Sequence, residues 1–169
     1  MKSERCEGGC LPTQDRALLL AWVAAVRAER NEDAKEIAER ASGGEGPGAR
    51  AIRALTKLDP GKPQAEVVRA IEDARDELAN AERGELEGMW FVPPPELDIA
   101  IAVAGVHRQR VDKSDGAETA AILDEVLQRY PASVEAHHWR MMVHLLNGEA
   151  QERDHHLRWL LEKAGPADA

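Results

Sequence analysis

The residues best suited to chemistry in this sequence are its histidines, and five of the six lie between His137 and His156. A neutral imidazole ring binds zinc or copper, and it also exchanges protons near neutral pH. His137 and His144 are seven residues apart on one predicted helix, and a turn at Gly148 brings a second helix with His156 back beside them. His137, His144 and His156 are therefore candidate ligands for zinc or copper, with Met141 at the same level of the hairpin.

A helical wheel of residues 134–146 separates two of these histidines from a wide apolar arc. His137, Arg140 and His144 fall together on the polar side of this wheel. The apolar arc is too wide for a single helix contact, so the helix must pack on two neighbours or leave an exposed groove. The arc comprises Val134, His138, Trp139, Met141, Met142, Val143, Leu145 and Leu146.

Trp159 is the second binding signal near the end of the chain. In its predicted helix, Leu157, Leu160, Leu161 and Ala164 form the expected buried stripe, and Trp159 points away from that stripe. A tryptophan outside the buried stripe indicates that another surface covers it. The candidates are a second copy of the chain, a partner protein and the N-terminal tail.

Signatures of catalysis are absent from the sequence. It contains no GxxxxGK[ST] or GxGxxG phosphate loop, no GxSxG nucleophile elbow and no HExxH metal motif. Cys6 and Cys10 form a single CxxxC pair, which we interpret as two thiols in a mobile tail because zinc patterns need further ligands at set distances, with a metal or redox role as the alternative. We therefore expect no catalytic residue and no cofactor, with zinc or copper as the alternative.

Composition and charge narrow the class of protein further. Hydrophobic residues make up 43% of the 169 residues and aromatic residues only 4%, which favours a core of packed helices over sheets. The net charge of −9 argues against nucleic acid as a partner, because phosphate binding needs clustered Lys and Arg. The most apolar stretch, residues 17–26, is too short to cross a bilayer. These features predict a soluble cytoplasmic protein without membrane insertion.

Hydrophobic periodicity predicts a series of helices separated by short breaks. The expected helices cover residues 15–30, 31–41, 49–58, 63–83, 96–111, 117–129, 134–146 and 150–164. The segment from Ser42 to Gly48 is a flexible loop by composition. We expect Asn31 to cap the second helix and fold it back on the first as a hairpin.

Residues 84–96 interrupt this helical pattern. Three consecutive prolines from Pro93 impose an extended course, and Trp90 and Phe91 stand just before them. One interpretation is that these aromatic residues plug the core between two halves of the fold. The other is that Trp90 and Phe91 form an exposed docking segment for a partner.

Glycine and proline recur at a nearly constant interval toward the C-terminus. Gly116 and Gly148 each mark a turn between helices, and Pro131 and Pro166 each follow a hairpin about 35 residues apart. Repeated helix–turn–helix units with this period are typical of α-solenoids. Together with the apolar second helix, these residues make 97–166 resemble the tetratricopeptide-repeat family, with degenerate repeats.

The resemblance implies a function as well as a fold. Tetratricopeptide repeats bind peptides in a concave groove lined by the first helix of each hairpin. The positions that match this lining are Glu135, His138, Trp139, Met142 and Leu146 in one hairpin, and Ile101, Ala104, Arg108 and Val111 in the preceding one.

The sequence thus predicts an all-α fold of antiparallel hairpins stacked as a short tetratricopeptide-like solenoid, with an irregular helical bundle as the alternative. We expect a flexible tail over 1–14, one domain over 15–166 and a C-terminal end at 167–169. The expected function is a non-catalytic adaptor or scaffold for a protein or peptide partner. The alternatives are a metal- or cofactor-binding protein that uses the C-terminal histidines, and a structural subunit that associates with itself.

Overall fold

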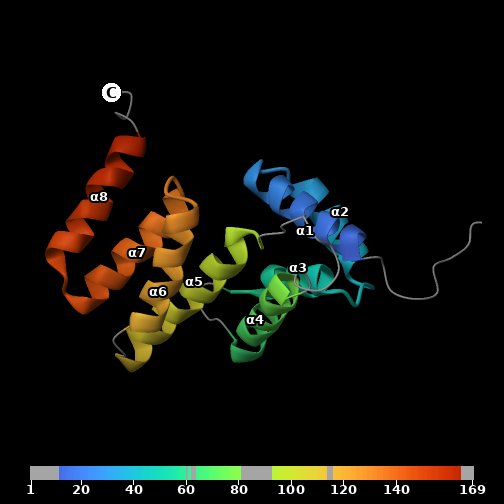
Figure 1. The fold of residues 1–169 in the computed structure, drawn as a ribbon, viewed down its shortest axis with the longest axis horizontal. Coiled ribbons are helices and arrows are strands. Elements are labelled where there is room, and N and C mark those ends of the chain that lie inside the picture. Colours follow the sequence, from blue (N-terminus) through green and yellow to red (C-terminus); the bar gives the residue numbers. More distant parts are fainter. Residues whose placement is uncertain (1–11, 60, 62–63, 81–92, 114–115, 165–169) are drawn as a thin grey trace, which may run out of the picture. The chain divides into compact units, whose positions relative to one another are not determined.

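The computed structural model describes residues 12–59, 61, 64–80, 93–113 and 116–164, and these residues form eight helices and no strand (Figure 1). The all-α prediction is confirmed. The helices are α1 (Pro12–Arg27), α2 (Asn31–Ala41), α3 (Pro47–Lys57), α4 (Ala65–Asn80), α5 (Pro95–Asp112), α6 (Ala117–Arg129), α7 (Val134–Asn147) and α8 (Ala150–Ala164).

The start of α1 differs from the sequence prediction. The helix begins at Pro12, three residues before the predicted Asp15, and proline is well tolerated in a first turn because the N–H it lacks would be unpaired there. Arg30, not the expected Asn31, is the N-cap of α2, and its side chain makes no capping hydrogen bond. Cys6 and Cys10 lie outside the described residues.

The helices group into two compact units, and the first contains α1 to α4 with the beginning of α5 up to Leu97. Within it α2 packs on α1 as the predicted hairpin, α4 packs on α3, and α3 also contacts α1 and α2. Ile71, Ala74 and Leu78 of α4 are buried.

A buried carboxylate ties α1 to the start of α3. Asp15 is 5% exposed, and its two oxygens accept hydrogen bonds from the backbone N–H groups of Gly48 and Ala49 in the first turn of α3. A Cβ atom added at Gly46 or Gly48 would lie 2.5 Å from an atom of Asp15. These two glycines therefore let α1 approach closely, a packing role that the composition of the Ser42–Gly48 loop did not predict.

Replacing Asp15 with alanine removes this cap and leaves two buried N–H groups unpaired. We expect Asp15→Ala to lower the free energy of unfolding by about 2 kcal/mol. Asp33→Ala is the control, because Asp33 pairs with Arg30 on the surface and such pairs contribute about 0–1 kcal/mol. Urea denaturation followed by circular dichroism measures both variants, and equal losses would contradict the assigned role of Asp15.

The second unit contains α5 from Asp98 onward with α6, α7 and α8. α7 packs on α6, and α8 folds back on α7 (Figure 1). α5 and α6 cross closely at Gly105, where an added Cβ atom would lie 2.2 Å from Oγ1 of Thr119. The core of this unit is formed by Ile99, Ala102, Val103, Val106, Leu123, Val126, Ala136 and Val143.

The two turn glycines have the conformation that their positions require. Gly116 has φ of 67° and Gly148 has φ of 77°, values in the left-handed region where glycine carries no steric penalty. Ser133 begins α7 by accepting a hydrogen bond from the N–H of Ala136 at 3.2 Å. The predicted helix boundaries around residues 117–147 are confirmed to within a residue.

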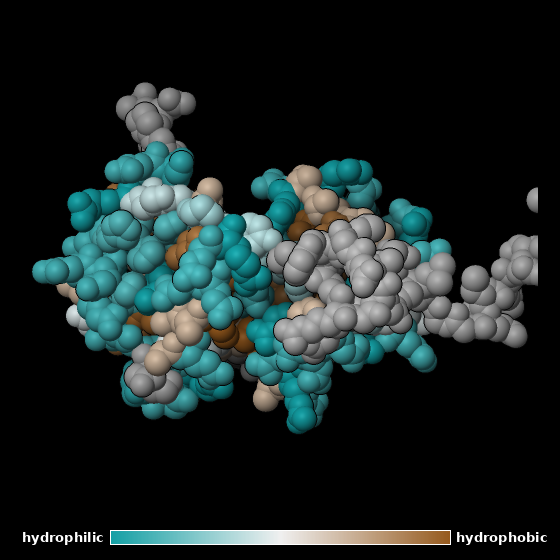
Figure 2. All heavy atoms as spheres, in the orientation of Figure 1, coloured by the Kyte–Doolittle hydropathy of each residue, from teal (hydrophilic) through white to brown (hydrophobic). Residues whose placement is uncertain are grey.

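Among the helices described, none is both long and apolar enough to cross a membrane. The face drawn in Figure 2 is mostly hydrophilic, with hydrophobic residues scattered between the polar ones.

Candidate functional site

The side of α7 that carries His137 and His144 is buried, not solvated. His137 is 8% exposed and His144 is 5% exposed, and both face α8, whereas His138 is exposed. The prediction that this side of α7 is polar and exposed is therefore wrong. The wheel ranked the faces by hydropathy, but His156 and Trp159 of α8 contact this face of α7 through their rings.

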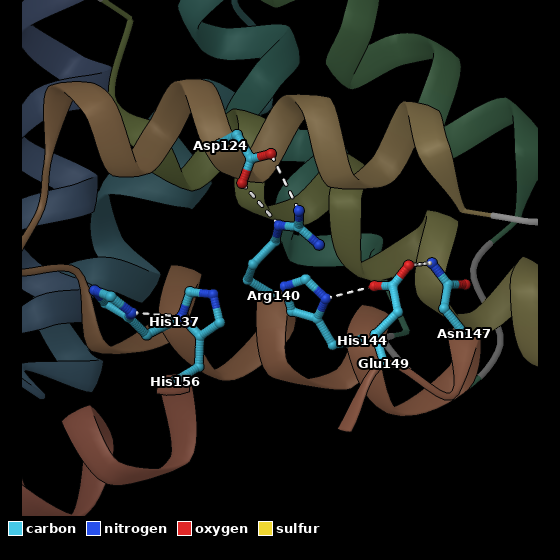
Figure 3. A network of polar contacts seen from close by, with 7 residues as sticks. All are labelled: Asp124, His137, Arg140, His144, Asn147, Glu149 and His156. Atoms are coloured by element: carbon cyan, nitrogen blue, oxygen red, sulfur yellow. Dashed lines mark hydrogen bonds and ion pairs between the residues drawn. The ribbon is translucent and has the colours of Figure 1, made fainter. Parts of the chain in front are cut away.

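His137 and His156 are joined by a hydrogen bond between their Nδ1 atoms at 2.8 Å (Figure 3). The Nε2 atom of His137 lies 3.1 Å from the carbonyl oxygen of Pro131, which can only accept. Neutral His137 must therefore carry its proton on Nε2, which leaves its Nδ1 as an acceptor. His156 must then be protonated on Nδ1 and donate to His137.

Trp159 completes the contact between the two helices. Its ring stacks on His137 with a centroid distance of 3.7 Å and an interplanar angle of 17°. Leu157 and Leu161 of the predicted buried stripe are instead 40% and 63% exposed. The predicted orientation of α8 is thus wrong, because α7 itself covers Trp159 and offers it an imidazole face.

A chain of polar contacts fixes the turn between α7 and α8. Nδ1 of His144 donates to Oε2 of Glu149 at 2.6 Å, and Asn147 donates to Oε1 of the same carboxylate at 3.4 Å (Figure 3). Gln109 of α5 donates to Oδ1 of Asn147 at 2.6 Å. The hydrogen bond from His144 holds the pKa of the Glu149 carboxyl below its usual value.

Arg140 links α7 to α6. Its guanidinium donates to both oxygens of Asp124, at 2.7 and 3.2 Å, and its side chain is only 15% exposed (Figure 3). An open pocket of about 420 Å³ lies beside the pair. Its lining residues are Ala117, Ala120, Ala121, Asp124, Arg140, Asn147 and Glu149. Because carboxylates and a guanidinium line this pocket together, it has no strong preference for an ion of either sign.

The electrostatics of the ring cluster favour neutral imidazoles. Burial lowers the pKa of His156 to about 4, with further contributions from the neighbouring histidines and Arg140. Burial also lowers the pKa of His137, and nearby His155 adds to this effect. Both rings are therefore neutral at pH 7.

Neutral imidazoles are the form that binds metals, but the geometry of this cluster does not identify metal ligands. Both ring nitrogens of His137 are already engaged in hydrogen bonds. Across the described part of the chain, no three His, Cys, Asp or Glu side chains are grouped so that they could hold a metal ion. The arrangement of His137, His144 and His156 is that of a packed interface between two helices.

The predicted partner-binding residues are spread over different surroundings. His138 is exposed, while Trp139 is half-buried with its ring centroid 6.2 Å from that of His107. Met142 and Leu146 are partly buried against the core shared by α5, α6 and α7. Trp90 and Phe91 lie outside the described residues, so the proposed docking segment around them stays a prediction.

Sequence reasoning missed the polar network that surrounds the histidines. Arg140 was placed on the same side of the helix as His137 and His144, but its partner Asp124 was not predicted, nor were Asn147 and Glu149, which flank the turn glycine Gly148. A carboxylate directly after a left-handed glycine lies close to the last turn of the helix before it, and this signal could have paired Glu149 with His144.

Comparison with models of protein families, with curated proteins and with solved structures gave no match.

The corrected orientation of α8 can be tested by truncating one residue on each side of the helix. We expect Trp159→Ala to lower the free energy of unfolding by about 2–3 kcal/mol, because it removes the stacked contact with His137. Leu161→Ala should cost less than about 1 kcal/mol, because most of that side chain is in water already. Chemical denaturation measures both, and a larger loss for Leu161→Ala would restore the orientation predicted from the sequence.

Proposed function

We propose that this chain is a non-catalytic binding module that receives an amphipathic helix of a protein partner on its α7–α8 hairpin. The observation that carries the proposal is the exposure of four aliphatic side chains on these two helices. Val134 is 56% exposed, Leu145 47%, Leu157 40% and Leu161 63%. These four residues are called the docking stripe below.

Helix geometry supports a single surface. On α7, Ala136 and Val143 are buried in the core with α6, His137 and His144 face α8, and Val134 and Leu145 come next around the helix. On α8, Leu157 follows His156 around the helix in the same order. Because the two helices are antiparallel and right-handed, Val134, Leu145 and Leu157 lie on the side of the hairpin away from α6, and Leu161 lies farther around α8.

The free energy gained by covering the docking stripe indicates a partner with an apolar face of its own. Covering one half-exposed leucine or valine contributes about 1 kcal/mol, so the stripe contributes about 4 kcal/mol in all. Association itself costs at least about 4 kcal/mol. A polar or extended peptide would add too little, whereas an amphipathic helix brings a second apolar stripe to the same contact.

The way in which α7 packs on the preceding hairpin, α5 and α6, supports a helix as the occupant of the docking stripe. α7 is itself an amphipathic helix, and it packs on α6 and on the core of α5 through Ala136, Val143 and Trp139. α7 covers the apolar surface of α5 and α6, and we propose that a partner helix covers the docking stripe of α7 and α8 in the same way. This stacking also supports our proposal that the C-terminal helices form a tetratricopeptide-like solenoid.

The test replaces two leucines of the stripe with lysines. We expect wild-type protein to capture a partner from native extract, and Leu157→Lys/Leu161→Lys to bind a synthetic helix of that partner about 100-fold more weakly. Gln128→Lys/Gln151→Lys is the matched control, because it adds the same charge at exposed polar positions and should bind like wild type. Titration calorimetry gives the three affinities.

Two results would overturn this proposal. One is equal binding by the stripe variant and wild type. The other is a wild-type dimer in sedimentation that the stripe variant converts to monomer, since the occupant would then be a second copy of the chain.

A further inference from the structure

The contact between α7 and α8 depends on a hydrogen bond that requires one unprotonated imidazole nitrogen. Only one proton fits between the Nδ1 atoms of His137 and His156, which are 2.8 Å apart. The carbonyl of Pro131 holds the proton of neutral His137 on Nε2, so Nδ1 of His137 is the acceptor of this bond. A proton added to Nδ1 of His137 would place two N–H groups against each other and break the bond.

A proton can also be added to Nε2 of His156, where the surroundings oppose the positive charge that the ring would then carry. From α7, Arg140 and the stacked ring of His144 face this side, and His155 is adjacent on α8. Lys163 of α8 lies 5.6 Å from the centre of the Trp159 ring.

The acidic groups nearby are largely engaged elsewhere. Glu149 accepts from His144, and Asp124 of α6 accepts from Arg140. Glu152, one turn before His156, is exposed to water, which screens it. No described carboxylate therefore accepts a hydrogen bond from His156 in the closed hairpin.

We propose that His137 and His156 act as a proton-sensitive latch, which holds α8 on α7 while both rings are neutral and releases α8 in mildly acidic solution. The latch is independent of the partner proposed above. It is a property of the hairpin alone, and it acts through a single hydrogen bond and the ring stack behind it.

The direction of the effect follows from the shifted pKa values. Both pKa values are lower in the closed hairpin than the value of about 6.5 for a free histidine. The closed form is therefore fully favoured above pH about 6.5 and loses stability as the pH falls toward about 4, the pKa of His156. Each proton taken up on opening raises the opening equilibrium about tenfold per pH unit.

Native-state hydrogen exchange of the full chain measures this opening directly. We expect the protection factors of the amides in α8 to fall at least about 20-fold between pH 7 and pH 5, as uptake of one proton requires. Amides in α3 serve as the internal control and should keep their protection, because α3 lies in the other unit and contains no histidine.

Two asparagine variants assign the effect to the latch. His156→Asn retains an N–H donor at the position of Nδ1 and cannot be protonated, so the slope of log protection factor against pH should fall by about one. His155→Asn removes an exposed histidine of the same helix and should leave the slope unchanged. A wild-type slope of zero in α8, or equal slopes for wild type and His156→Asn, would overturn the proposal.

Discussion

The hydrogen bond between two neutral imidazole rings is the contact through which α7 holds α8. His137 and His156 share one proton, and Trp159 stacks on the back of His137. Leu157 and Leu161 of α8 are exposed, whereas the rings of His156 and Trp159 contact α7. The attachment of α8 therefore depends in part on ring geometry and protonation, and it responds to pH in a way that an aliphatic contact does not.

The same arrangement explains why aliphatic residues remain exposed. Because His156 and Trp159 face α7, Leu157 and Leu161 of α8 are turned toward solvent, and Val134 and Leu145 of α7 are exposed as well. Four aliphatic side chains of this hairpin are exposed in this way, which is why we propose that a further helix covers them.

Sequence patterns predicted the architecture well and the faces of the last two helices poorly. Helix positions from 95 to 164 follow from periodicity, and the turns follow from Gly116 and Gly148, because only glycine adopts their positive φ without strain. The orientation of α7 and α8 could not be derived in this way, since hydropathy ranks histidine as polar while burial with a ring partner makes it part of the interior. The long-range cap of α3 by Asp15 was equally hidden, because its partners are more than thirty residues away.

Nuclear magnetic resonance of ¹⁵N-labelled protein at neutral pH tests the central claim most directly, because it reports which ring nitrogens carry protons. Our account predicts that His137 is the Nε2–H tautomer, that His156 is the Nδ1–H tautomer, and that a scalar coupling crosses the hydrogen bond between their Nδ1 atoms. Two rings that exchange between tautomers, with no coupling between them, would show that this bond does not hold α8 in place.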